Sequence, residues 1–456
     1  MRMKSLHYCL LSMVVITLNA CATISINHNM PNNAEEKSTS YSLQEHLGNK
    51  NTGNILLVLN FSGGGSRAAA LAYGVLLELR DTTIYINGEP RRLLDEVDLI
   101  SSVSGGSFTA AYYGLNGEKT FSQFESDFLR KDIQGELVNS MIQPSQWVSD
   151  KGRTDMVIDY YQQHLFNNAT FGDLQKGNGP MVLISATDLS SGARVSFIQE
   201  YFNFICSDIN QFPIADAVAA SSAVPFIFDP LVVRNFSYEQ CVTQQLEHLG
   251  SVLNRLDDLK NPELILAANN LKKIFEQKDS FQYLHLVDGG ITDNLGLRSL
   301  IEMVELSGGI RNFLDSMQIK PVNRSAIIVV DASTDPTYEM AKKSEPPSMT
   351  EIAKAVSDIQ LHRYNASTKS LMQRTLEQWN NQLSDEGIHL QKTDYIEVNL
   401  REISAIQKQS LINQIPTSLS LTDAQVDALI AAGRDLLRHN ITFQALVHQY
   451  DRYLPQ

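Results

Sequence analysis

The stretch Leu99-Ile100-Ser101-Ser102-Val103-Ser104-Gly105-Gly106-Ser107 decides how this chain folds. An apolar run rich in β-branched residues ends there in serines and glycines, and the helix-forming Phe108-Thr109-Ala110-Ala111-Tyr112 follows. This order predicts a strand that turns sharply into a helix, with Ser104 presented at the turn as a nucleophile. Because strand and helix cross closely there, small residues are needed two positions before and after Ser104. Ser102 and Gly106 occupy those positions, and Ser102 departs from the glycine that is usual at the first of them.

Three further apolar runs predict buried strands, at residues 55–59, 180–186 and 326–330. The first leads into a glycine-rich loop and then into a helix pattern from residue 68 to about residue 79. Strands that are apolar on both faces and separated by helical stretches indicate a sheet with helices on both sides. The sequence therefore predicts an α/β layer architecture.

The composition argues against some partners. The chain has 456 residues, enough for a large core, and a formal net charge of −14. Nucleic-acid binding requires clustered lysines and arginines, so this charge argues against a nucleic-acid partner. It also disfavours electrostatic adhesion to anionic lipids. No cluster of His, Cys or Asp has the spacing of metal ligands, so no metal is expected.

The N-terminus has the features of a signal peptide. Arg2 and Lys4 precede an apolar segment at residues 6–18, which is too short to span a membrane. We therefore expect residues 1–20 to be removed on export. The segment ends in Leu18-Asn19-Ala20-Cys21, which resembles a bacterial lipobox and implies a lipid on Cys21. Alanine after this cysteine, as in Gram-negative lipoproteins, favours the outer membrane; the alternative is ordinary secretion, including to the periplasm.

The composition also divides the rest of the chain. Residues 21–50 are polar with few large apolar groups and predict a flexible tether. Residues 51–335 are expected to form the core, with a helical, charged insertion at about residues 236–280. Residues 336–456 predict a mostly helical extension packed on that core, in which Thr422-Asp423-Ala424-Gln425 resembles a capping box.

Two cysteines, Cys206 and Cys241, remain when the signal peptide and Cys21 are set aside. In an oxidising compartment they either form one disulfide or stay unpaired. Both alternatives are open, because the sequence does not give their separation in space.

Gly63-Gly64-Gly65-Ser66-Arg67 forms the loop after the first strand. Successive glycines allow a close approach of the backbone and turn its N–H groups toward one point, where they stabilise negative charge. That charge is either a phosphate or the oxyanion of a tetrahedral intermediate. The G-K-[ST] ending of a phosphate loop and the G-x-G-x-x-G pattern of a dinucleotide site are both missing.

A third element is the strand Leu284-His285-Leu286-Val287-Asp288-Gly289-Gly290, which ends in an acidic residue and two glycines. Asp188 and Asp331 also end apolar runs, and we interpret them as turn formers. In their order, the glycine loop, the serine elbow and this Asp-Gly-Gly resemble the patatin-like phospholipase family over residues 54–335. Supporting stretches are Ile184-Ser185-Ala186-Thr187-Asp188-Leu189, Ala217-Val218-Ala219-Ala220-Ser221-Ser222-Ala223-Val224-Pro225, Asp293-Asn294-Leu295-Gly296 and the ending from Ile415-Pro416-Thr417 onward.

The resemblance implies a three-layer α/β/α sandwich with a mainly parallel sheet, and a catalytic dyad without cofactor. Ser104 is then the nucleophile and Asp288 the general base. Backbone N–H groups of the glycine loop stabilise the oxyanion, and Arg67 holds that loop in place. The residues implied in the oxyanion hole are Gly63, Gly64, Gly65, Ser66 and Arg67, and those of the elbow are Ser102, Gly105 and Gly106. The implied reaction is acyl transfer from a membrane lipid ester to Ser104, followed by hydrolysis.

Other interpretations stay open. A Ser-His-Asp hydrolase would use His362, His389 or His439 as its third member. Transfer of the acyl group to an acceptor other than water would make the protein an acyltransferase. A non-catalytic lipoprotein that binds lipid on the same scaffold is a further alternative, and the oligomeric state is not predicted.

Overall fold

The computed structural model describes residues 29–32, 40–50, 55–141, 152–225, 227–241, 259, 261–319, 322, 324–335, 339–385, 393–403 and 406–451. The expected signal peptide, Cys21 and His389 lie outside these residues. In the described part of the chain, no helix is both long and apolar enough to span a membrane.

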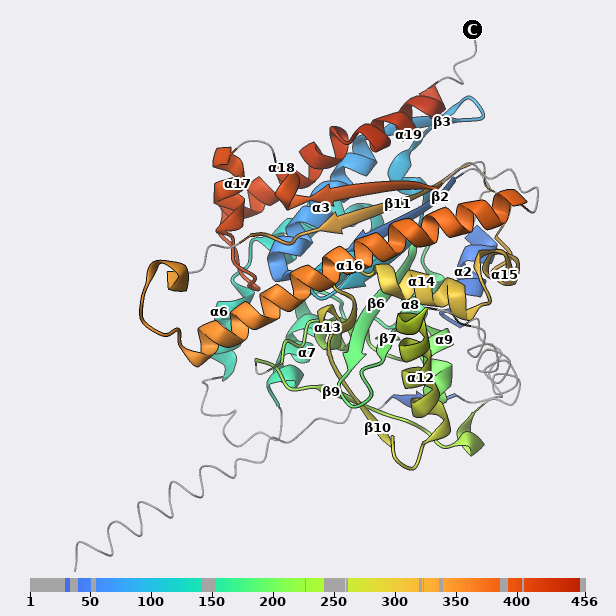
Figure 1. Ribbon diagram of the computed structural model, residues 1–456, viewed down its shortest axis with the longest axis horizontal. Helices are drawn as coiled ribbons and strands as arrows, with labels where there is room; N and C mark the ends of the chain where they lie inside the picture. Colours follow the sequence, from blue (N-terminus) through green and yellow to red (C-terminus); the bar gives the residue numbers. More distant parts are fainter. Residues whose placement is uncertain are drawn as a thin grey trace, which may run out of the picture.

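A mostly parallel sheet forms the centre of the molecule (Figure 1). Within the described ranges it has eight strands, in the order β12-β11-β2-β5-β6-β10-β9, with β7 paired to β6. The parallel strands are β12 (Asp394–Asn399), β11 (Arg324–Asp331), β2 (Ile55–Phe61), β5 (Val97–Val103) and β6 (Met181–Asp188). The antiparallel strands are β10 (Tyr283–Asp288), β9 (Leu231–Arg234) and β7 (Arg194–Ser196). The expected α/β class and mainly parallel sheet are therefore confirmed.

Helices cover the two faces of this sheet. The connections between parallel strands run from β2 through β5 to β6 in one direction and from β11 to β12 in the other, so right-handed crossovers place their helices on opposite faces. One face carries α3 (Gly65–Asp81), α4 (Gly105–Asn116) and α10 (Ile214–Ser221), with α18 (Asp423–Arg438) outside α3 and α7 (Arg153–His164) beside α10. The other carries α13 (Gly290–Asp293), α14 (Leu297–Leu306) and α16 (Met349–Asp385), with α12 (Pro262–Glu276) and α15 (Ile310–Ser316) beside α14. Figure 1 shows α16 running diagonally across the front of the sheet.

The remaining elements lie around these layers. They are the helices α2 (Leu43–Lys50), α5 (Thr120–Phe124), α6 (Ile133–Met141), α8 (Phe171–Lys176), α9 (Gln199–Phe202), α17 (Ile406–Asn413) and α19 (Ile441–Asp451). Two small antiparallel pairs complete the described strands, β1 (Met30–Pro31) with β8 (Ser207–Asp208) and β3 (Thr83–Ile86) with β4 (Glu89–Arg92).

The expected tether at residues 21–50 needs a correction. Its described parts, residues 29–32 and 40–50, pack on the body, and Tyr41 and Leu43 are almost completely buried. The Tyr41 hydroxyl donates to the Val182 carbonyl at 3.0 Å and accepts from the Val182 N–H at 2.8 Å, so it replaces a neighbouring strand beside β6. The prediction was wrong here because a few apolar residues in a polar segment are enough to fill a gap in the core.

The C-terminal region belongs to the sheet as well as to the helical layers. The extension at residues 336–456 is mostly helical where it is described, but β12 continues the sheet in parallel with β11. Helix α18 lies so close to α3 that a Cβ on Gly74 or Gly433 would collide with the backbone of the other helix. In the expected insertion at 236–280, the structure describes α12 but not residues 242–258.

Candidate active site

Ser104 lies at the turn between β5 and α4. Its backbone has φ 50° and ψ −121°, a conformation that a residue with a side chain rarely adopts. Such a conformation costs about 1–3 kcal/mol and persists only where the surrounding structure enforces it. The strand before the serine and the helix after it impose this turn, and they place the hydroxyl at the carboxyl edge of the parallel strands.

The elbow accommodates serine at position 102. Ser102 is completely buried in β5, and its hydroxyl donates to the Leu183 carbonyl of β6 at 2.9 Å. The hydroxyl therefore has a partner, and the register of β5 against β6 continues through this residue. Position 106, in contrast, does not accommodate a side chain, because a Cβ there would lie 2.7 Å from the Phe61 carbonyl oxygen.

The Ser104 hydroxyl donates a hydrogen bond to Asp288 Oδ2 at 2.8 Å, although the two residues are 184 positions apart. Asp288 ends β10, and its own N–H donates to the Ala223 carbonyl at 3.0 Å. Both side chains are nearly buried, with residue exposures of 7% for Ser104 and 9% for Asp288. Burial raises the pKa of Asp288 to about 6, although hydrogen bonds from the Gly290 N–H and the Ser104 hydroxyl act in the opposite direction.

A second serine holds the elbow. Ser221, at the end of α10, accepts the Ser104 N–H at 2.8 Å and donates to the Ser185 carbonyl at 2.7 Å. Its carbonyl accepts the N–H of Gly289, the residue after Asp288. Ser221 thus connects the two ends of the Ser104–Asp288 pair. Ser221 belongs to a stretch that resembles the family, but its sequence pattern predicted no role for it.

The glycine loop lies directly before α3. Gly64 has φ +139° and Gly65 has φ +60°, so both adopt backbone conformations that favour glycine. The Gly63 N–H donates to the Asn294 carbonyl at 3.0 Å, and the Ser66 N–H donates to the Ser418 carbonyl at 2.8 Å. Within the described residues, the N–H groups of Gly64 and Gly65 have no hydrogen-bond partner. Gly64 and Gly65 are therefore two of the residues expected in an oxyanion hole whose N–H groups are free to bind an oxyanion.

Arg67 binds carbonyl groups on two distant segments. Its guanidinium donates to the Ala332 carbonyl at 2.9 Å, just after β11, and to the Ile415 carbonyl at 2.8 Å, before α18. Burial lowers the pKa of Arg67 to about 10, and the negative charges of Asp358 and Asp331 partly offset that effect. The side chain therefore fastens the glycine loop to the C-terminal region.

A buried group of charged side chains lies beside the turn that follows Asp288, and it was not predicted from the sequence. Arg194 on β7 forms ion pairs with Asp293, at 3.6 Å, and with Glu302 of α14. All three side chains are at least 95% buried. Asp293 also accepts the N–H groups of Leu297 and Ser299, so it caps the start of α14. These contacts fix the turn that follows Asp288.

The other candidate residues lie elsewhere. Asp188 accepts the Ser191 and His285 N–H groups at 2.8 Å each, as a turn former does. Asp331 pairs with Lys369 at 2.7 Å. In the part of the chain that the structure describes, no histidine forms a hydrogen bond with Ser104 or Asp288. Nor do the described residues contain a group of three or more His, Cys, Asp or Glu that would hold a metal ion.

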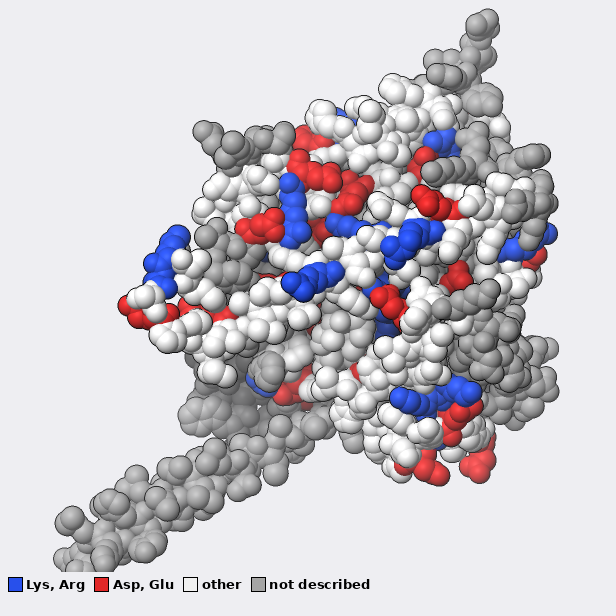
Figure 2. All heavy atoms as spheres, in the orientation of Figure 1, with Lys and Arg blue, Asp and Glu red and all other residues white. Residues whose placement is uncertain are grey.

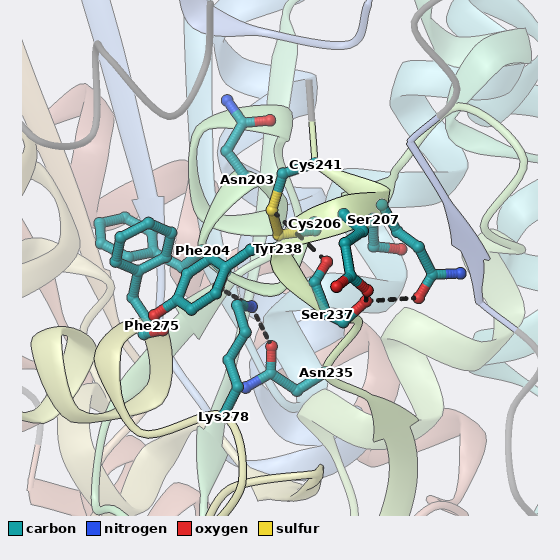
Figure 3. Close-up of a disulfide and its surroundings, with 12 residues drawn as sticks. Asn203, Phe204, Cys206, Ser207, Asn235, Ser237, Tyr238, Cys241, Phe275 and Lys278 are labelled. Atoms are coloured by element: carbon teal, nitrogen blue, oxygen red, sulfur yellow. Dashed lines mark hydrogen bonds between the residues drawn. A yellow bond between two sulfur atoms is a disulfide. The ribbon is translucent and has the colours of Figure 1, made fainter. Parts of the chain in front are cut away.

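Cys206 and Cys241 form a disulfide with their Cα atoms 4.7 Å apart (Figure 3). It joins the turn before β8 to the start of the insertion. Beside it, Lys278 donates to Asn235 Oδ1 at 2.7 Å and lies over the Tyr238 ring. Burial lowers the pKa of Lys278 to about 8. The disulfide is far from the Ser104 elbow in the chain and contributes no group to it.

A strained serine between a parallel strand and a helix, with its hydroxyl bonded to a carboxylate, is an arrangement typical of serine hydrolases with an α/β fold. The sequence comparisons specify the family. A model of the family described as patatin-like phospholipase matches residues 59–301, and the chain belongs to this family. No curated protein sequence matches the chain.

Two solved structures show a distant likeness to this chain. Human GIVD cytosolic phospholipase A2 is 12% identical with a TM-score of 0.40, and the match covers 88% of this chain and 62% of that one. VipD from Legionella pneumophila is also 12% identical, with a TM-score of 0.34 and coverage of 87% and 67%. The chain thus spans about three fifths of the length of the human enzyme.

Proposed function

We propose that this protein is a lipid acyl hydrolase that uses Ser104 as nucleophile and Asp288 as general base. The observation that carries the proposal is the 2.8 Å hydrogen bond from the Ser104 hydroxyl to Asp288, at a strained elbow in a patatin-like phospholipase domain. The substrate class is an ester of a membrane lipid, as the family description indicates.

In the first half of the reaction, the Ser104 oxygen attacks the carbonyl carbon of the ester and its proton moves to Asp288 Oδ2. The tetrahedral intermediate collapses, the proton passes from Asp288 to the leaving alcohol or lyso-lipid, and an acyl group stays on Ser104. In the second half, Asp288 accepts a proton from water, whose oxygen attacks the acyl-enzyme. The fatty acid leaves and the proton returns to the Ser104 oxygen.

The pKa of Asp288 suits this role. An ordinary aspartate is a weak base with a pKa of about 3.9. Burial raises the pKa of Asp288 to about 6, which makes its carboxylate a better proton acceptor and still leaves it ionised near neutral pH.

The free N–H groups of Gly64 and Gly65 are the proposed donors to the oxyanion. Preorganised backbone donors of this kind stabilise the charge that develops on the ester oxygen. The N–H groups of Gly63 and Ser66 are already bound to carbonyls, so in this proposal they hold the loop and do not contact the intermediate.

A histidine-containing triad has less support. His362 is half-buried in α16, where burial and the nearby Arg401 lower its pKa. His439 is exposed at the end of α18, and its Nδ1 atom pairs with the Asp435 carbonyl. His389 lies outside the described residues.

We further propose that export and a lipid on Cys21 bring the enzyme to the bacterial outer membrane. This proposal rests on the lipobox-like sequence alone, because Cys21 lies outside the described residues. A bilayer anchor would raise the local concentration of a lipid substrate, which fits a lipid ester as the substrate class.

The proposal is tested by incubating the purified protein with defined phospholipid vesicles and identifying the products by mass spectrometry. We expect free fatty acid and lyso-lipid from the wild type. Ser104→Ala and Asp288→Asn are expected to release fatty acid more slowly by a factor of about a thousand or more. His362→Ala is the control and retains activity. Loss of activity in His362→Ala with retention in Asp288→Asn would overturn the dyad, and an acyl product on an added alcohol but none on water would indicate a transferase.

A further inference from the structure

The first half of α16 has an apolar stripe that the fold leaves uncovered. Met349, Ile352, Val356 and Ile359 recur at intervals of three and four, so they share one side of the helix. Their exposed fractions are 80%, 40%, 52% and 50%. We refer to these four residues as the α16 stripe. Scattered exposed aliphatic residues need no explanation, but four in register on one helix indicate a contact surface.

The α16 stripe faces away from the body of the protein. Farther along the helix, the buried residues Met372 and Trp379 lie roughly 160° and 140° around the axis from Val356. The acidic residues Glu351 and Asp358 are likewise turned away from Val356, by roughly 140° and 160°. Figure 2 shows this end of α16, at the left side of the molecule above the grey residues, as a mostly white surface with acidic groups along one edge. The outward side is therefore apolar only where the helix begins.

The helix that carries the stripe contacts elements of the candidate active site. Asp358, on the inward side of the same turns, is close enough to Arg67 of the glycine loop to affect its pKa. Helix α13, which begins two residues after Asp288, packs against α16 and exposes Ile291 with 49% of its surface. Val224 and Ile227, exposed by 38% and 57%, follow Ala223, whose carbonyl accepts the Asp288 N–H. Exposed aliphatic residues thus occur on α16, on α13 and in the segment after Ala223, and the last two of these adjoin Asp288 directly.

We propose that the α16 stripe docks on the surface of a phospholipid bilayer and brings the neighbouring Ser104 site against the lipid that it hydrolyses. This inference rests on the proposed function, since a site for membrane lipid esters must meet the bilayer. The exposed fractions correspond to roughly 400 Å² of apolar surface, half of the about 800 Å² that each partner buries in a standard protein interface. A single convex helix with this much apolar surface suits shallow insertion at the boundary between head groups and acyl chains.

The charge pattern agrees with a lipid partner. Arg363 is exposed on the same side of the helix as Val356, at the end of the stripe, where a guanidinium meets the phosphates of lipid head groups. The chain as a whole is acidic, with a net charge of −14, so apolar contact must provide most of the attachment. Binding is therefore expected to depend only weakly on salt.

The test uses the full chain with Cys21→Ser, which removes the candidate lipid-attachment residue, and compares it with a variant that also carries Ile352→Asp and Ile359→Asp. Vesicles of phosphatidylethanolamine and phosphatidylglycerol are floated on a density gradient, and bound protein is measured in the Ser104→Ala background so that the lipids stay intact. Hydrolysis of a soluble short-chain ester and of vesicle phospholipid is measured in parallel with Ser104 present. Leu266→Asp, which changes a 62% exposed residue on α12, is the matched control.

We expect the stripe variant to lose vesicle binding and phospholipid hydrolysis by about tenfold or more, because each buried aliphatic group adds to partitioning. Its activity on the soluble ester and the behaviour of Leu266→Asp stay unchanged. Equal vesicle binding by both chains overturns the proposal, as does a dimer that the stripe substitutions dissociate. If the aspartates impair folding, Ile352→Ser with Ile359→Ser gives the same comparison. Failure of the proposed function is distinguishable, since the wild type would then hydrolyse neither substrate whether or not it binds vesicles.

Discussion

The Ser418 carbonyl accepts the Ser66 N–H at 2.8 Å and thereby joins the C-terminal region to the glycine loop. Arg67, the next residue, reinforces this junction through the Ile415 carbonyl. The family match ends at residue 301, so the chain beyond the family domain supports the loop that contains the proposed oxyanion donors. Residues beyond the part that matches the family model, Ile415 and Ser418, therefore help to hold the glycine loop of the candidate site.

Gly65→Ala tests this junction. A Cβ at position 65 would collide with the Ser418 carbonyl, and the residue would have to keep φ +60°. We expect kcat on a soluble ester to fall about a hundredfold, comparable to the loss of one oxyanion donor. Gly88→Ala is the control, because it has φ +82° but no atom within 4 Å of the new Cβ. Gly88→Ala keeps its activity; an active Gly65→Ala would contradict the assignment of this loop.

The pH dependence of activity reports on Asp288. The base is the carboxylate, and its pKa is raised to about 6 by burial, so protonation removes the base at a higher pH than for an ordinary aspartate. We expect log kcat/KM on a soluble ester to rise with unit slope below about pH 6 and to level off above it. A midpoint near the ordinary value of about 3.9 would show that burial does not affect Asp288 in this way.

Arg194→Met tests whether the buried ion pairs of Arg194 with Asp293 and Glu302 stabilise the protein. The substitution leaves Asp293 and Glu302 buried without their cation, and we expect the free energy of unfolding to fall by about 3–5 kcal/mol. Denaturant titration measures the change. Arg311→Met removes an ion pair with Asp315 whose side chains are 45% and 64% exposed, and it is expected to change stability by less than about 1 kcal/mol. Equal effects of the two substitutions would disprove a structural role for the buried group.

Cys241→Ser tests the disulfide to Cys206. The bond closes a loop with a sequence separation of 35, for which restriction of the unfolded chain predicts about 3–4 kcal/mol of stabilisation. We expect the melting temperature of the variant to drop to that of the reduced wild type, while activity on a soluble ester at room temperature stays similar. No difference between oxidised wild type and variant would mean that the two cysteines are unpaired in the protein.

The sequence predicted the parts of the fold that depend on local pattern. Residues 55–59, 180–186 and 326–330 are continuous apolar runs, and they became β2, β6 and β11 because strands in the middle of a covered sheet are buried on both faces. The elbow was also visible, because a nucleophile at a sharp turn requires small residues around it.

Some features that depend on distant contacts were not predicted, although the resemblance to the family did imply the Ser104–Asp288 pair. β12 alternates apolar and polar residues over a short stretch, as an edge strand does, and only its pairing with β11 distinguishes it from a loop. Tyr41 lies in a polar segment, and the hydrogen bond that fixes its side chain goes to Val182, which is far along the chain. The support from Ser221 and Ser418 is equally non-local, since a serine hydroxyl and a backbone carbonyl leave no distinctive sequence pattern.

The central claim is that Ser104 is a nucleophile activated by Asp288. Its most direct test is reaction of the folded protein with a fluorophosphonate probe, followed by mass-spectrometric mapping of the modified peptide. We predict one adduct, on Ser104, which is absent in Ser104→Ala and forms at least about a hundredfold more slowly in Asp288→Asn. A folded wild type that stays unlabelled, or an adduct on any other residue, would contradict this account.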